Sequence, residues 1–242
     1  MQEVSIFDKL PFGIVQTIQY SMITQATFDF LSRLKENNTR KWFQENKKAY
    51  EGAKKEVETF VAGLIPELSK LDPGIQSPDV KDCMFRIFKD VRFSKDKSPY
   101  KTNFGAFIGK GGRKTTHPGY YVHIEPGESM IAGGVYMPQP EVLKQLRNEV
   151  YFNSSEFRKI IESKEFVKRF GKLGEFDRMK KAPRDFPADF PDIDLLKYRS
   201  FIVSIMVPDD KVLQGDYVKY ILDVAKSMLP FHSFLSRAIS NG

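Results

Sequence analysis

The sequence contains little cysteine and little histidine, which limits the chemistry open to it. Cys83 is the only cysteine among 242 residues, so an internal disulfide is excluded and a reducing compartment is expected. Its apolar neighbours predict that Cys83 is a buried, unreactive side chain. Of the three histidines, His123 could bind a metal ion together with Glu125, because both side chains would lie on one face of a strand. No third ligand is suggested, so we predict no metal site, and the sequence indicates no particular cofactor.

The sequence also lacks a long apolar run. No segment approaches the ~18 uninterrupted apolar residues of a membrane span. Residues 1–21 do not show a basic region followed by an apolar one, so a secretory signal is not expected. We therefore predict a cytoplasmic protein without a membrane partner. The sequence does not indicate an oligomeric state.

The first 21 residues differ in pattern from the rest of the chain. Pro11 interrupts this stretch, and the first clean helical pattern begins after Thr24. Two interpretations remain open: residues 1–21 are an extension upstream of a native start at Met22, or they form an ordered arm. Residues 22–242 are predicted to form a single domain.

The charge of the chain is concentrated in one region. The 38 Lys and Arg residues exceed the 31 Asp and Glu residues by seven. Between Lys81 and Lys114 there are ten basic residues and three aspartates, so this region alone carries the whole excess. A local basic excess of this kind favours an anionic partner. The region also contains aromatic residues and Pro99, so it is the first place to look for a binding site.

Hydrophobic periodicity predicts an α+β fold, in which a small antiparallel sheet is packed between helices that come before and after it. Pro66 and Pro230 fall inside helical patterns, where proline kinks or ends a helix. Turn residues separate the three short strand patterns that come after the basic region, which is typical of an antiparallel meander. Helices are predicted over about 25–36, 40–70, 140–150, 154–161, 165–170 and 214–238, and strands over about 103–108, 120–125, 130–136 and 200–206.

The basic stretch from Arg86 to Lys101 is predicted to begin as a strand. Apolar residues alternate with charged ones in it, so that Arg86, Asp90 and Arg92 share one face and Phe93 lies on the other. A helical interpretation would make Arg86 and Asp90 an i,i+4 pair. The strand and the helical interpretations therefore both place the side chains of Arg86 and Asp90 close together. Residues 95–99 must form a loop because Pro99 cannot donate to a ladder.

The residue types of this stretch and of the second strand suggest an anion site beside proton-transfer groups. Arginine offers a planar fork for a carboxylate or phosphate, and lysine a mobile charge. The candidate catalytic residues are Asp90, Tyr121 and His123. The candidate anion-binding residues are Arg86, Arg92, Lys95, Lys97, Tyr100 and Lys101.

Three functions are compatible with these residues. The first is binding of a phosphorylated or carboxylated small molecule, either by a binding protein or by an enzyme. The second is a nucleic-acid-binding module, because aromatic and basic side chains are interleaved. In the third, the basic stretch is structural: Arg86 and Asp90 form a pair of low exposure, and the function lies in a protein interface. The glycines at 105, 109 and 111 do not match a phosphate-binding loop.

The stretch Arg86-Ile-Phe-Lys-Asp-Val-Arg-Phe-Ser-Lys-Asp-Lys-Ser-Pro-Tyr-Lys-Thr102 resembles the signature of the family called domain of unknown function 2461, conserved hypothetical proteins of bacteria and fungi. Leu34-Lys-Glu-Asn-Asn38 is similar to its N-terminal helices, and Gly119-Tyr-Tyr-Val-His-Ile-Glu-Pro-Gly127 to its central hairpin. The resemblance covers about residues 23–235, with Lys89 where arginine is expected. It implies no established activity, cofactor or catalytic residue.

Overall fold

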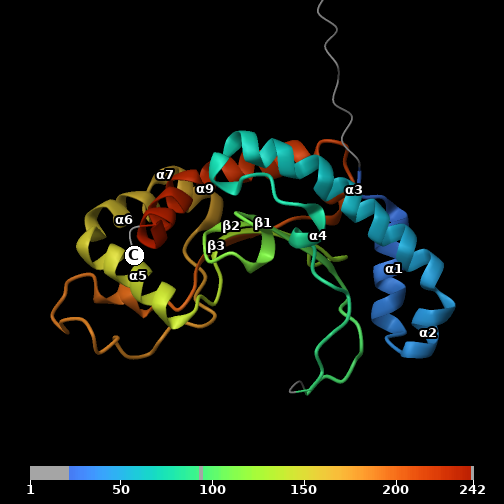
Figure 1. Cartoon of the computed structure of the whole chain (residues 1–242), viewed down its shortest axis with the longest axis horizontal. Coiled ribbons are helices and arrows are strands. Elements are labelled where there is room, and N and C mark those ends of the chain that lie inside the picture. Colours follow the sequence, from blue (N-terminus) through green and yellow to red (C-terminus); the bar gives the residue numbers. More distant parts are fainter. Residues whose placement is uncertain (1–21, 93–94, 241–242) are drawn as a thin grey trace, which may run out of the picture.

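The computed structural model describes residues 22–92 and 95–240. The predictions for residues 1–21, and for Phe93 in the basic stretch, lie outside the described residues. Figure 1 shows an arch of helices with a sheet beneath its middle. The helices are α1 Gln25–Glu36, α2 Arg40–Glu45, α3 Lys47–Leu71, α4 Val80–Cys83, α5 Pro140–Phe152, α6 Ser154–Ile161, α7 Lys164–Phe170, α8 Asp209–Val212 and α9 Tyr217–Ser240, with short 3₁₀ turns at Pro73–Ile75, Gly112–Lys114 and Ile193–Lys197.

The sheet has four strands in the order of the sequence: β1 Phe104–Gly109, β2 Gly119–Ile124, β3 Met130–Val135 and β4 Phe201–Met206. Every neighbouring pair is antiparallel, and Phe107, Tyr121, Ala132 and Ser204 lie opposite one another across it. The sheet and the helices on either side of it in the sequence confirm the predicted single-domain α+β class. The strands fall within one or two residues of their predicted positions.

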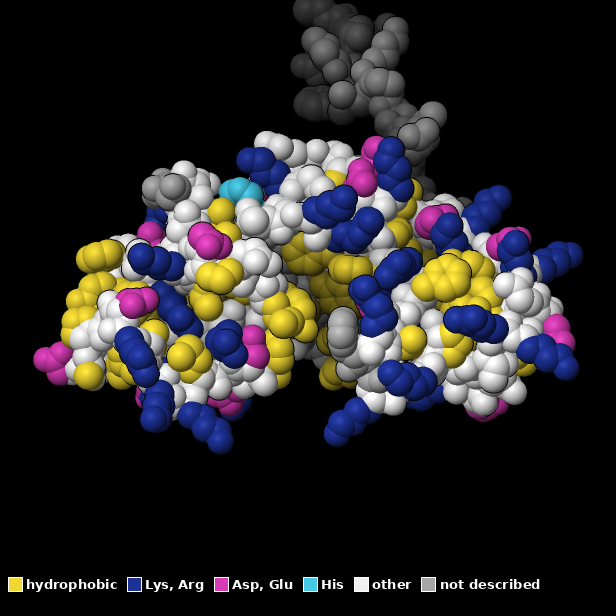
Figure 2. Space-filling view, turned by 60° about the horizontal axis from the view of Figure 1, so that its bottom comes forward, with side chains coloured by type: hydrophobic (Ala, Val, Ile, Leu, Met, Phe, Trp, Pro, Cys, Tyr) yellow, Lys and Arg dark blue, Asp and Glu magenta, His cyan; other side chains and the backbone are white. Residues whose placement is uncertain are grey.

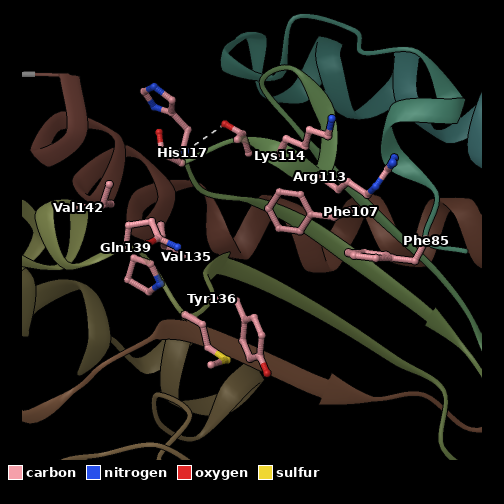
Figure 3. A pocket seen from close by; sticks show the side chains of 14 residues that line it. Phe85, Phe107, Arg113, Lys114, His117, Val135, Tyr136, Gln139 and Val142 are labelled. Atoms are coloured by element: carbon pink, nitrogen blue, oxygen red, sulfur yellow. Dashed lines mark hydrogen bonds between the residues drawn. The ribbon is translucent and has the colours of Figure 1, made fainter. Parts of the chain in front are cut away.

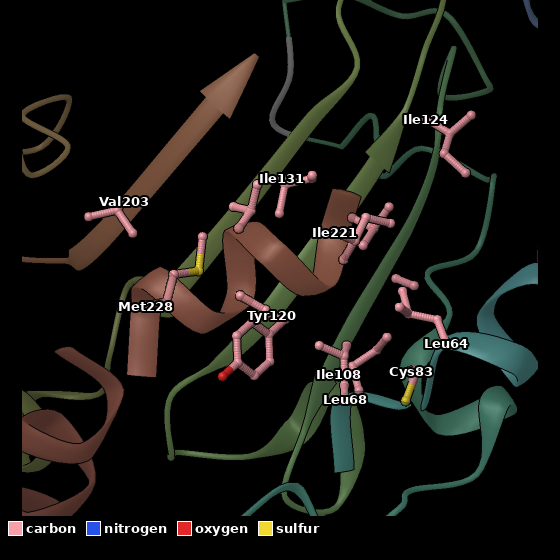
Figure 4. Close-up of a cluster of buried hydrophobic side chains, with 14 of the residues drawn as sticks. Leu64, Leu68, Cys83, Ile108, Tyr120, Ile124, Ile131, Val203, Ile221 and Met228 are labelled. Atoms are coloured by element: carbon pink, nitrogen blue, oxygen red, sulfur yellow. The ribbon is translucent and has the colours of Figure 1, made fainter. Parts of the chain in front are cut away.

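One face of the sheet is covered by the two longest helices, α3 and α9, which form the back of the arch (Figure 1). Side chains that point to this face are almost completely buried, since strand residues alternate between the two faces. Figure 4 shows this core, in which Met228 of α9 and Leu64 of α3 meet strand residues such as Ile108 and Ile131. Cys83 is buried in the same cluster, as predicted.

The opposite face of the sheet is open, and this positions the candidate site. In β4, Ser204 and Met206 on this face are exposed and Ile202 is half-buried, whereas Phe201 and Val203 on the other face are buried. Within the part of the chain that the structure describes, no long helix covers the open face (Figure 1), and in Figure 2 the molecule is hollowed between two lobes. One lobe carries α1, α2 and the basic stretch, and the other carries α5 to α7. The open face is therefore the floor of a cleft.

The single helix predicted over 40–70 is divided in the structure at Asn46. The Asn46 amide nitrogen donates to the Trp42 carbonyl at 2.9 Å, and the Asn46 backbone nitrogen does so at 3.0 Å. An asparagine side chain that competes in this way for a helical carbonyl favours a break. Pro66, in contrast, does not end α3, which continues to Leu71, and Pro230 lies inside α9.

The prediction of a strand in the basic stretch was wrong. Among its described residues and those just before it, the structure has two isolated bridges, Met84 with Ala106 and Phe88 with Tyr100. Between them Lys101 donates its backbone N–H to the Ile87 carbonyl at 2.8 Å. The stretch is therefore a ribbon that is attached to the sheet at its base and extends away from it (Figure 1).

In the described part of the chain, no helix combines the length and the apolar character that crossing a bilayer requires.

Candidate functional site

The deepest part of the cleft is a cavity of about 460 Å³ over the open face of β1 to β4. This volume is within the range of small-molecule sites, which are about 300–1,000 Å³. Aromatic and aliphatic side chains make most of its surface, and a few polar groups are grouped at one end. The polar groups are Lys101, Asn103, Tyr121, His123 and Ser204.

A chain of hydrogen bonds runs along the polar end of this cavity. Tyr121 Oη lies 2.9 Å from His123 Nδ1, and His123 Nε2 lies 2.8 Å from Glu125 Oε2. The second carboxylate oxygen of Glu125 accepts from the Thr102 hydroxyl at 2.6 Å. The three residues are two apart on one strand, so the alternation of β2 places their side chains on one face. The chain ends in a tyrosine hydroxyl at the cavity.

The surrounding donors fix the tautomer of His123. Asn103 Nδ2 lies 3.3 Å from His123 Nδ1, and an amide nitrogen can only donate. Nδ1 is therefore an acceptor, and it also accepts from the Tyr121 hydroxyl. The ring proton must then be on Nε2, which donates it to Glu125. The far side of the His123 ring faces a nearly buried carboxylate, since 9% of the Glu125 side chain is exposed.

The Tyr121 hydroxyl stays protonated at neutral pH. Burial, together with the nearby charge of Glu125, raises the pKa of Tyr121 to about 12. A protonated phenol in this position can donate a hydrogen bond to an anion. Its place depends on Gly105, because a Cβ atom there would lie 2.6 Å from Tyr121 Oη.

Lys101 supplies positive charge to the same cavity. Its ammonium lies 5.4 Å from the centre of the Phe85 ring, and no carboxylate of the described residues is paired with it. Partial burial, and secondarily the charge of Arg86, lower the pKa of Lys101. A half-buried ammonium without a counter-ion is unfavourable, and a bound anion would relieve this.

The remaining charged candidates in the basic stretch lie outside the cavity, and two of them, Asp90 and Arg92, are paired with one another. Arg92 donates to both carboxylate oxygens of Asp90 at 3.0 and 2.7 Å, and this lowers the pKa of the exposed Asp90 to about 2. Lys97 donates to the Val91 carbonyl at 3.0 Å, and Lys89 pairs with Asp96. Exposed pairs of this kind contribute little to stability. Neither Arg86, Asp90, Arg92, Lys95 nor Lys97 is among the described residues that line the cavity.

Tyr100 is a packing residue rather than part of the site. Its ring is 4% exposed and stacks on Phe43, with the ring centres 3.9 Å apart. Its backbone is held by Asn38, whose amide donates to the Tyr100 carbonyl at 2.9 Å and accepts from the Tyr100 nitrogen at 3.1 Å. Asn38 thus takes the place of a neighbouring strand and fixes the base of the ribbon, including Lys101, against the α1–α2 turn.

The structural alternative for the basic stretch predicted a weakly exposed pair of Arg86 and Asp90. Both residues are exposed instead, and Asp90 bonds Arg92. In the part of the chain that the structure describes, no three His, Cys, Asp or Glu side chains are grouped so that they could hold a metal ion. The groups that do come together are therefore Lys101, Tyr121 and His123, with Glu125 behind them.

Several residues of the site were not predicted from the sequence. Thr102 bonds Glu125, Asn103 lies against His123, and Gly105 makes room for Tyr121. Glu125 was placed on one strand face with His123, but only as a possible metal ligand and not as its hydrogen-bond partner. The period of two in β2 was a usable signal for Glu125, since it shares the parity of Tyr121 and His123. The contribution of residues 102–105 depends on the pairing of β1 with β2, which periodicity alone does not give.

A family model described as "Conserved hypothetical protein (DUF2461)" matches residues 26–234, which is most of the chain. The chain belongs to the DUF2461 family. This confirms the resemblance seen in the sequence. A comparison with curated proteins and one with solved structures each found no match. The range matched by the DUF2461 model includes all residues that line the cavity, and also Glu125.

Proposed function

We propose that this DUF2461 chain binds a phosphorylated or carboxylated small molecule on the open face of its sheet and that binding is coupled to uptake of a proton by His123. The observation that supports this most is that the half-buried Lys101, which pairs with no carboxylate of the described residues, lines the same cavity as the end of the Tyr121–His123–Glu125 hydrogen-bond chain. Together they offer an anion one positive charge and one hydroxyl donor in a largely apolar cavity, where charge-assisted hydrogen bonds are strong.

The proton is taken up because the anion competes with His123 for the Tyr121 hydroxyl. When the Tyr121 O–H turns from Nδ1 to an oxygen of the ligand, Nδ1 loses its better donor. A proton from solvent then binds Nδ1, which donates in turn to Tyr121 Oη. The Glu125 carboxylate, 2.8 Å from Nε2, stabilises the imidazolium that forms. With a reactive ligand, the same groups act as a general acid: Tyr121 gives its proton to the ligand and receives the one on His123.

Proton uptake is the first prediction. Calorimetric titration with inorganic phosphate at pH 8, repeated in buffers of different ionisation enthalpy, should show up to one proton taken up per phosphate bound. The uptake should disappear in His123→Gln, which has no group that titrates in this range, and persist in the control His117→Gln. Equal uptake in the native chain and in His123→Gln would refute the coupling.

The second prediction distinguishes anion binding in the cavity from anion binding on the exposed part of the ribbon. Lys101→Met should weaken phosphate binding about 10-fold or more, since a charged hydrogen bond is lost in a partly buried place. Lys97→Met is the matched control: Lys97 is in the same basic stretch, but it bonds the Val91 carbonyl outside the cavity. The measurement is an NMR titration that follows the His123 ring. If both variants weaken binding equally, the anion binds the ribbon and not the cavity.

A further inference from the structure

A second hollow of about 250 Å³ adjoins the first one. Figure 3 shows it from close by, with Arg113, Lys114 and His117 along one side of it. The two hollows share four lining residues, which are Phe85, Phe107, Gly134 and Tyr136. They are therefore parts of one groove that runs along the open face of the sheet.

The shared part of the groove is aromatic and accessible. Phe85 is 38% exposed and Tyr136 60%, and Tyr136 stacks on the equally exposed Phe176 with the ring centres 5.5 Å apart. Phe85 in turn meets the edge of Tyr121 at 6.0 Å, so the aromatic surface reaches the polar end of the first cavity. Exposed aromatic rings grouped in a groove are typical of a binding site, where they offer faces for stacking.

The charged residues that line the groove are of one sign. Lys101 lines one hollow, and Arg113 and Lys114 line the other. Arg113 is held in place by its hydrogen bond to the Lys81 carbonyl at 2.8 Å. Among the described residues that line the two hollows, none is aspartate or glutamate. A ligand that matches this groove has a flat ring for the aromatic part and negative charge for the basic residues.

We infer that the ligand of the proposed site is a nucleotide, with its base stacked on the aromatic part of the groove between Phe107 and Tyr136 and a phosphate on Lys101 and Tyr121. The inference depends on the proposed function for the position of that phosphate. Arg113 and Lys114 receive a second phosphate where the nucleotide carries one.

The test compares adenosine 5′-monophosphate with ribose 5-phosphate, which has the same phosphate but no base. Stacking should make the mononucleotide bind about tenfold more tightly. Tyr136→Ala should remove most of this difference and leave ribose 5-phosphate binding unchanged. Phe152→Ala is the matched control, because Phe152 is also an exposed aromatic, 76% accessible, but lines neither hollow.

The inference is overturned if the two compounds bind equally, or if neither binds and only a tetranucleotide does, which would indicate a single-stranded nucleic acid instead. It is also overturned if Tyr136→Ala and Phe152→Ala have the same effect. Equal binding of both compounds that still depends on Lys101 would leave the proposed anion site intact and remove only the base. Adenosine 3′,5′-bisphosphate should bind more tightly than the monophosphate, and Arg113→Gln should abolish that gain.

Discussion

Replacing Gly134 by alanine should destabilise the protein by about 4 kcal/mol. Gly134 lies in β3 on the floor of the groove with a φ of +117°, a conformation that L side chains rarely adopt. A Cβ atom there would be 2.1 Å from the Phe201 carbonyl oxygen in β4. Backbone strain of this kind costs about 1–3 kcal/mol, and forcing an atom into a packed place costs about as much again. Urea unfolding measures the loss.

Gly127→Ala is the control for this prediction. Gly127 also has a positive φ, +76°, but nothing lies within 4 Å of the Cβ that alanine would add. Only the strain term applies there, so the loss should be about 1 kcal/mol. The difference between the two variants isolates the close approach of β3 and β4. Losses of similar size would show that the contact with Phe201 is relieved by a small shift of the strand.

Lowering the pH from 7 to 5 should reduce the free energy of unfolding, and His232→Leu should flatten this dependence. His232 is 2% exposed beneath the sheet and lies against Tyr120, with the ring centres 4.6 Å apart. Its Nδ1 is 4.0 Å from Asp72 Oδ2, which accepts the Tyr120 hydroxyl at 3.0 Å. Burial lowers the pKa of His232, and the neighbouring Asp72 only partly opposes this.

The sign follows from proton binding in the two states. Below pH 6.5, the ordinary value for histidine, the unfolded chain binds a proton that the folded chain still excludes, so stability falls as the pH drops. The slope for one such group is at most about 1.4 kcal/mol per pH unit. The pKa of Asp72 is also lowered in the folded state. The stability that Asp72 contributes is therefore present above pH 3.8, the ordinary pKa of aspartate, and is lost only below that pH.

The two windows can therefore be separated by denaturant unfolding at a series of pH values. His232→Leu should remove most of the slope between pH 6.5 and 5, whatever its effect on stability at pH 7. His117→Gln should keep most of it, because His117 is only partly buried. An unchanged slope in His232→Leu would mean that another group takes up the proton.

Periodicity was sufficient to predict the strands and most of the helices, because the sheet has one buried and one open face. Tyr121 and His123 could be placed on one face for the same reason. The basic stretch is the exception: its alternation of Phe85, Arg86 and Ile87 looks like a strand, but its pairing is limited to isolated bridges among the described residues. Its charges pair within the ribbon, as Asp90 does with Arg92.

The division of the basic stretch could not be predicted from spacing. Lys101 and Lys97 are four residues apart and have the same chemistry, yet one lies in the cavity and the other outside it. The difference arises from Asn38, which is 62 residues from Tyr100 in the sequence and holds its backbone in place. Contacts between residues so far apart in the sequence form only in the tertiary structure and cannot be predicted from spacing. The burial of the Tyr100 ring against Phe43 is another contact of this kind.

The order of the strands has a consequence for how the protein folds. β1, β2 and β3 succeed one another through short turns, so their pairing closes only short loops. β4 pairs with β3 only after residues 136–200 have been placed, and closing this longer loop carries a larger entropic cost. The part of the groove on β1 to β3 therefore depends on pairing between strands that are close in the sequence. The part on β4 depends on a long-range pairing that we expect to form later, and slow refolding phases should be sought there.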